Sequence, residues 1–170
     1  MATYRTSRSI EASLIQYLEA ELVSGGWSNI SVEKSFNRVY DLAVGGASKK
    51  AVICVRLAET DIARGEIGSD SMIKNVMVLI DIFASSDGQR LDLKDFLVSK
   101  LIIGCVFYNY TTVQSGRSTS VNTKTADGRL RILNIDDTPV NFEVGKSELD
   151  VHDRYRHRLT LSISRGKLET

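Results

Sequence analysis

Three acidic residues in the first half of the chain, Glu59, Asp61 and Asp81, are the first candidates for chemistry. A metal-dependent nuclease gathers such carboxylates at one end of a sheet around a divalent ion, usually with a lysine close by. The spacing of these three residues does not require that they converge. We therefore keep a small nuclease-like enzyme as an alternative, and expect a protein that is not an enzyme and has no catalytic residue, cofactor or metal site.

The two histidines and the two cysteines do not form a recognisable site. His152 and His157 are five residues apart, which places them on opposite faces of a strand or about 140° apart on a helix. Neither geometry lets both bind one zinc ion. Cys54 and Cys105 lie inside apolar runs, so we expect both thiols to be buried in the core. No Gly-x-Ser-x-Gly nucleophile motif is present.

The stretch LIDIFASSDGQRLDLKDFLVSKLI, residues 79–102, joins an apolar strand to a helix through the turn 85–88. Serine and aspartate at such a turn cap the helix by accepting hydrogen bonds from its first free N–H groups. Arg90, Asp92 and Asp95 then alternate in sign with Lys94, a pattern typical of a solvated helix face or a subunit contact. The turn is interpreted as a structural joint and not as a phosphate site.

Three arginines near the C-terminus, Arg154, Arg156 and Arg158, repeat with a period of two and would share one face of a strand. This face is either solvated or in contact with acidic residues of a neighbouring subunit, because guanidinium groups pair well with carboxylates. Direct DNA binding is disfavoured by the nearby Asp150 and Asp153 and by a net charge of only +1.

The polar segment SGRSTSVNTKTADG, residues 115–128, predicts a protruding loop or hairpin arm. It is either a surface loop or an extension that reaches a neighbouring subunit. The candidate residues for subunit or partner contacts are Arg117, Lys124, Arg129, Arg154, Arg156 and Arg158.

The hydrophobic pattern predicts one domain, residues 1–170, of the α+β class. We expect a mixed or antiparallel sheet with two main helices packed on it as a single pair of layers. The expected helices are 10–23 and 87–103, the clearest strands are 50–58, 75–84 and 157–164, and an exposed loop is expected at 59–72.

Composition excludes several classes of protein. Lysine and arginine total 22 against 21 aspartate and glutamate, so there is no global field to attract DNA or an acidic membrane. The N-terminus is polar and the apolar runs are too short to span a bilayer. We expect a cytosolic protein or a component of a soluble particle, without a membrane partner.

The order of elements resembles that of a known family. An amphipathic first helix, a strand of the VRLAETD kind, the stretch LIDIFASSDGQRLDL and a final alternating strand HRLTLSIS are similar to tail-terminator and related neck proteins of long-tailed bacteriophages. The similarity covers most of the chain in order and size, through architecture and not through a residue-level signature.

The resemblance implies a structural virion protein made in the host cytoplasm. Such subunits form a ring, commonly a hexamer, that caps the tail tube and joins it to head-completion or stopper proteins, with DNA only passing through the lumen. Another neck adaptor, a stopper or a tail-completion protein, is the closest alternative. Closing a ring from identical contacts multiplies a modest subunit affinity and leaves no open end.

Overall fold

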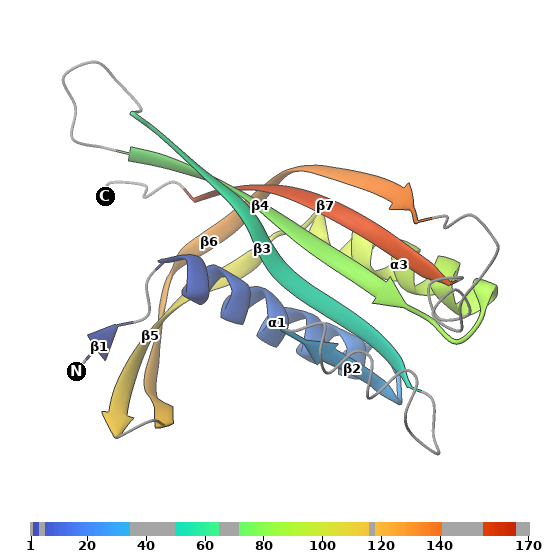
Figure 1. The fold of residues 1–170 in the computed structure, drawn as a ribbon, viewed down its shortest axis with the longest axis horizontal. Helices are drawn as coiled ribbons and strands as arrows, with labels where there is room; N and C mark the ends of the chain where they lie inside the picture. Colours follow the sequence, from blue (N-terminus) through green and yellow to red (C-terminus); the bar gives the residue numbers. More distant parts are fainter. Residues whose placement is uncertain are drawn as a thin grey trace, which may run out of the picture.

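A computed structural model of the chain describes residues 2–3, 6–34, 50–64, 72–115, 118–140 and 155–165. Within these residues it has two helices and a seven-stranded sheet in the order β1-β5-β6-β7-β4-β3-β2 (Figure 1). The elements are β1 (Ala2–Thr3), α1 (Thr6–Ser24), β2 (Ile30–Glu33), β3 (Ala51–Arg64), β4 (Met72–Phe83), α3 (Asp87–Leu101), β5 (Cys105–Ser115), β6 (Ser118–Pro139) and β7 (Arg156–Arg165).

Helix α1 forms because its apolar residues recur at helical spacing and bury one side. Ile10, Leu14 and Leu18 are fully buried, as expected for an amphipathic helix. The helix ends where Gly26 adopts a positive φ of 75°, which glycine tolerates without strain. The predicted helix 10–23 is confirmed, with one additional turn at its start.

Helix α3 begins at the predicted joint. The hydroxyl of Ser86 accepts a hydrogen bond from the backbone N–H of Gln89, and the Gln89 side chain accepts one from the N–H of Ser85. This reciprocal pairing satisfies two groups at the start of the helix. The prediction that the turn is a helix cap is therefore confirmed.

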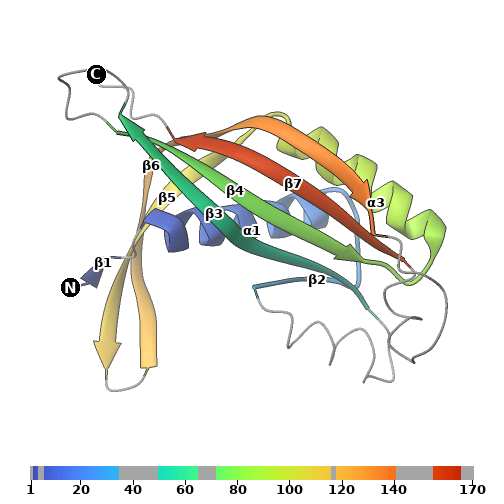
Figure 2. The ribbon, with the colours of Figure 1, turned by 45° about the horizontal axis from the view of Figure 1, so that its top comes forward.

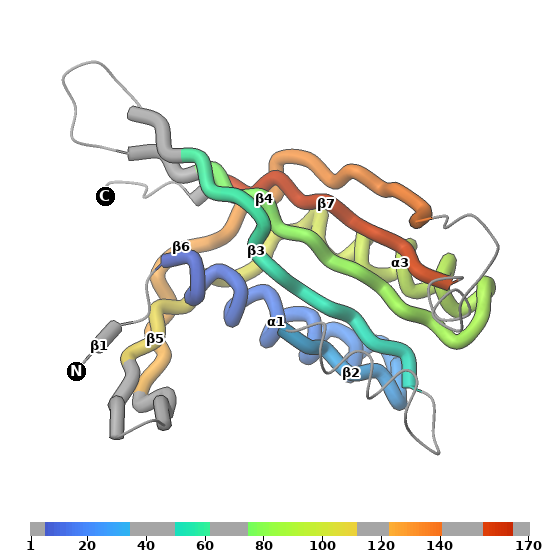
Figure 3. Tube along the Cα trace, viewed as in Figure 1, coloured from blue at the N-terminus to red at the C-terminus, as the bar shows by residue number. Residues whose placement is uncertain are grey.

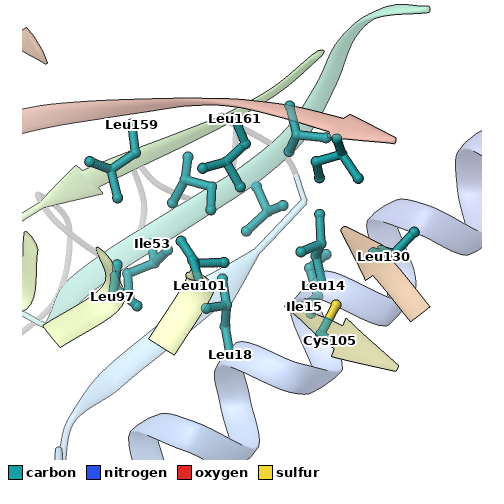
Figure 4. Packing of buried hydrophobic residues seen from close by; sticks show 14 of the residues in the cluster. Leu14, Ile15, Leu18, Ile53, Leu97, Leu101, Cys105, Leu130, Leu159 and Leu161 are labelled. Carbon is teal, nitrogen blue, oxygen red and sulfur yellow. The ribbon is translucent and has the colours of Figure 1, made fainter. Parts of the chain in front are cut away.

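Both helices pack on the same face of the sheet, which we call the inner face. Figure 4 shows side chains from α1 and α3 converging on Ile53, Leu159 and Leu161 from the central strands. The two helices also touch each other, because the Tyr17 hydroxyl donates to the Lys100 carbonyl at 2.8 Å. The cysteines Cys54 and Cys105 are both buried, as predicted.

The sheet is mixed, since β2 runs parallel to β3 and every other neighbouring pair is antiparallel. It curls into a half-barrel (Figure 2). Register shifts at Leu57/Glu59 and Ile132/Asn134 mark β-bulges, which increase local twist and bend a strand. The α+β class with two helices on a mixed sheet is confirmed, whereas a single flat pair of layers is not, because of the curl.

Two strands are longer than the hydrophobic pattern predicted. The prediction of a loop at 59–72 is wrong for residues 59–64, because β3 continues to Arg64 and pairs with β4 along this stretch. The described residues of the predicted arm, 115 and 118–128, fall in β5 and β6, which pair from Ser115 and Ser118 back to Cys105 and Leu130. The trace in Figure 3 follows β6 from this hairpin to the side of β7.

Neither described helix combines the length and the apolar character that crossing a lipid bilayer requires.

Candidate functional site

A buried carboxylate on the outer face of the sheet, the face away from α1 and α3, binds two arginines of β7. Asp81 is 0% exposed and lies on β4 directly opposite Arg158. The Arg158 Nε donates to Asp81 Oδ1 at 2.9 Å, and the Arg156 Nε donates to the same oxygen at 3.1 Å. The Arg156 guanidinium also lies over the Phe83 ring, 5.0 Å from its centroid. We call Asp81, Arg156 and Arg158 the outer cluster.

The outer cluster explains how charged groups are buried here. A carboxylate removed from water is costly unless it is paired and hydrogen-bonded. Two guanidinium forks supply that compensation, while the side chains of Arg156 and Arg158 remain 12% and 31% exposed. Arg156 and Arg158 share one face of a strand, as predicted. Both side chains donate hydrogen bonds to Asp81 of their own chain. Their role in subunit contacts stays a prediction.

A second charged cluster lies at the inner edge of the sheet, where β7, the end of β6 and the start of α3 meet. The His157 Nε2 contacts Asp137 Oδ1, and its Nδ1 lies 3.0 Å from Arg90 NH1. Because a guanidinium can only donate, Nδ1 accepts and Nε2–H donates to Asp137. Lys94 also contacts Asp137, at 3.2 Å. Arg90, Lys94, Asp137 and His157 form the inner cluster.

The geometry of the inner cluster indicates a structural role and not a catalytic one. A histidine acts as a general base only if a ring nitrogen is free to take a proton from a reacting group. Here the acceptor nitrogen of His157 is engaged by Arg90, and the His157 side chain is only 4% exposed. The cluster therefore ties the start of α3 to β6 and β7.

Because of its contacts in the inner cluster, we expect Asp137 to stabilise the fold at neutral pH. Burial raises the pKa of Asp137, but hydrogen bonds from His157 and Lys94 outweigh it and hold the pKa below its ordinary 3.8. A carboxyl whose pKa is lower in the folded state stabilises the fold above pH 3.8 and loses this contribution as the pH falls through the folded pKa. In urea unfolding, the stability difference between wild type and Asp137→Asn should be largest near neutral pH and shrink below pH 3.8. A difference independent of pH would contradict this role.

The two cysteine thiols are poor nucleophiles near neutral pH. Burial raises the pKa of Cys54 to about 11, with the negative charge of Asp81 adding to the effect. Burial likewise raises the pKa of Cys105 to about 12. Because the thiolate is the nucleophile, both side chains act as small apolar core residues near neutral pH.

The three carboxylates considered for a metal site do not converge. Glu59 and Asp61 lie opposite Met77 and Asn75 of β4, whereas Asp81 is four and six residues further along that strand, roughly 13 Å and 20 Å away. Asp81 is also occupied by two arginines. Within the described ranges, no three His, Cys, Asp or Glu side chains are grouped closely enough to hold a metal ion.

The arm residues have different surroundings. Lys124 is exposed, and its Nζ lies 5.0 Å from the centroid of the Tyr108 ring. Arg129 is exposed and donates to the carbonyls of Ile103 and Gly104, both at 3.3 Å. Arg117 and Arg154 lie outside the described residues.

Arg131 and Leu133 of β6 were missed by sequence reasoning. Arg131 is exposed, and Leu133 is 63% exposed at the bulge between Ile132 and Asn134. Simple alternation in RLRILNI puts Leu133 on the same side as Arg131, but it does not reveal the bulge at Leu133. A large exposed apolar side chain beside an exposed cation is a common feature of contact surfaces.

The fold and its two clusters define an α+β protein with a curled mixed sheet, two helices on its inner face and internally paired charges at one end. No known family model matches the chain, and no curated protein matches it in sequence.

Proposed function

We propose that this chain is a structural virion protein, a tail terminator of a long-tailed bacteriophage. Six copies would close a ring that caps the tail tube and joins it to head-completion or stopper proteins, with DNA passing through the lumen. In this proposal the helices form one layer and the sheet the other, and the exposed part of the outer sheet face, around Glu59 and Asp61, would make contacts. The protein would be made in the host cytoplasm and end in the neck of the particle.

The long β5–β6 hairpin is the observation that carries the proposal. Figure 2 shows it running out past the body formed by the helices and the central strands. A two-stranded extension buries little of its own surface, so it gains stability when it lies on another molecule. Exposed Lys124 and Arg129 on this hairpin would add contacts to a neighbouring subunit or to the tube.

Binding to a polymerising tail tube tests the proposal. Purified protein would be added to the tail tube protein encoded in the same genome, and tubes would be examined by negative-stain electron microscopy. A terminator yields rings in solution or on tube ends and arrests growth at one end. Binding to head or portal components without tube capping would instead identify another neck adaptor, and binding to neither would contradict a role in the neck.

A further inference from the structure

Two open strand edges lie on opposite sides of the sheet. Strand β2 pairs with β3 only from Ala51 to Cys54, so residues 55–64 of β3 have no described strand on the side away from β4. Strand β5 stops pairing with β6 at Leu130, so residues 131–139 have no described strand on the side away from β7. Unpaired edges attract other chains unless they are protected. On β3 the Leu57 N–H already donates to the Glu11 carboxylate at 3.1 Å, so the open part of that edge begins after Leu57.

One row across the outer face ends in opposite charges on the two edges. Asp61 lies opposite Asn75, Asn75 opposite Ser164, and Ser164 opposite Arg131. This row therefore begins with a carboxylate on β3 and ends with a guanidinium on β6. Three strand spacings separate Asp61 from Arg131, about 14 Å, which is too far for an ion pair within one chain.

The neighbouring row has a carboxylate on β3 but ends in an uncharged residue on β6. Glu59 on β3 lies in a row with Met77, Ser162 and Asn134. Glu59, Asp61 and Arg131 are exposed and have no ion-pair partner in the described part of the chain. Elsewhere on the molecule, exposed carboxylates such as Asp87 and Asp95 are paired with a basic residue of their own helix. The charges on the two edges are thus available for a second molecule.

Exposed apolar groups lie beside these charges. Each edge contains a bulge, and the extra residues are Ala58 on β3 and Leu133 on β6, both exposed. Met77, 38% exposed, lies next to Glu59 on the outer face. The bulges interrupt the regular hydrogen-bonding ladder, so the contact is made through side chains and not through a continuous sheet.

We infer that the β3 edge of one copy binds the β6 edge of the next copy, with Glu59 and Asp61 facing the partner's Arg131. The contact joins two different surfaces, so it is head-to-tail, and repetition around an axis closes a ring. Because β3 and β6 are antiparallel in the sheet, a second copy in the same orientation brings Asp61 of one copy level with Arg131 of the next. This contact rests on the proposed ring function and names the surfaces that would build it.

Charge reversal tests the contact by sedimentation velocity. One variant carries Glu59→Lys and Asp61→Lys, and the other carries Arg131→Glu. Each alone places like charges across the contact and should weaken self-association by about 100-fold or more. An equimolar mixture should restore assemblies that contain both variants, and so should the chain with all three changes. The change Asp92→Lys on the exposed side of α3 is the matched control and should leave association unchanged.

The outcomes separate this contact from the proposed function. Single variants that assemble like wild type, a mixture that stays dissociated, or a wild type that is monomeric up to about 1 mM would each overturn the contact. If the charge-reversal variants still form rings and cap tubes, the terminator function stands and the proposed contact is contradicted. If the single variants dissociate and their mixture reassembles, but the protein does not bind tubes, the contact stands and the terminator function is contradicted.

Discussion

Replacing Asp81 by asparagine is expected to lower the free energy of unfolding by about 3–5 kcal/mol, because it leaves two arginines without their buried counter-charge. Asp81 is fully buried and accepts from both Arg156 and Arg158. Urea unfolding followed by circular dichroism gives the value. The exposed carboxylate Asp92 is the control, and its change to asparagine should alter stability by no more than about 0.5 kcal/mol.

A further variant separates the cost of breaking the outer cluster from its net contribution. Changing Asp81 to leucine together with methionine at both arginine positions removes all three charges at once. Buried ion pairs are often replaceable by apolar residues with little loss, so this triple change should be far less destabilising than Asp81→Asn. If the single and triple changes cost the same, burial of an uncompensated charge is not the cause.

Gly104→Ala should destabilise the protein by about 2–5 kcal/mol, since alanine at this φ is strained by about 1–2 kcal/mol and overpacking adds about 1–3 kcal/mol. Gly104 has a φ of 73°, and a Cβ there would lie 2.6 Å from the Leu130 carbonyl oxygen. The residue lets the chain turn from α3 into β5 while touching the neighbouring strand β6.

Gly128 provides the matched control for this prediction. Its φ is 85°, yet a Cβ would meet nothing within 4 Å. Gly128→Ala should therefore show only the strain, about 1–2 kcal/mol. Equal losses at the two positions, measured by thermal and urea unfolding, would exclude the close approach to Leu130 as a cause.

Local periodicity made the helices and β7 predictable. Residues of α1 repeat at helical spacing, and Leu159, Leu161 and Ile163 alternate with polar residues and are buried as expected. Such patterns report which side chains face a core. The cap at Ser86 was equally local, because the bonding partner is three residues away.

Features that depend on pairing between distant segments were not predictable. The polar residues 59–64 continue β3 because they pair with β4, although their side chains at Glu59 and Asp61 do not face the core. Likewise, Asp81 and Arg156 are 75 residues apart, and only the register of β4 against β7 brings them together. Hydrophobic alternation predicts which side chains are buried but not which residues of neighbouring strands lie opposite each other. The outer cluster could therefore not be predicted from sequence spacing.

The unbroken course of β6 has a mechanical consequence. The strand is 22 residues long, a contour of about 70 Å, and pairs first with β5 and then with β7. A pull on the hairpin along the strand loads the hydrogen bonds between β6 and β7 in shear, so that they resist together and not one after another. The load is thus shared along β7, and near the far end of β6 Asp137 is also tied to α3 through Lys94.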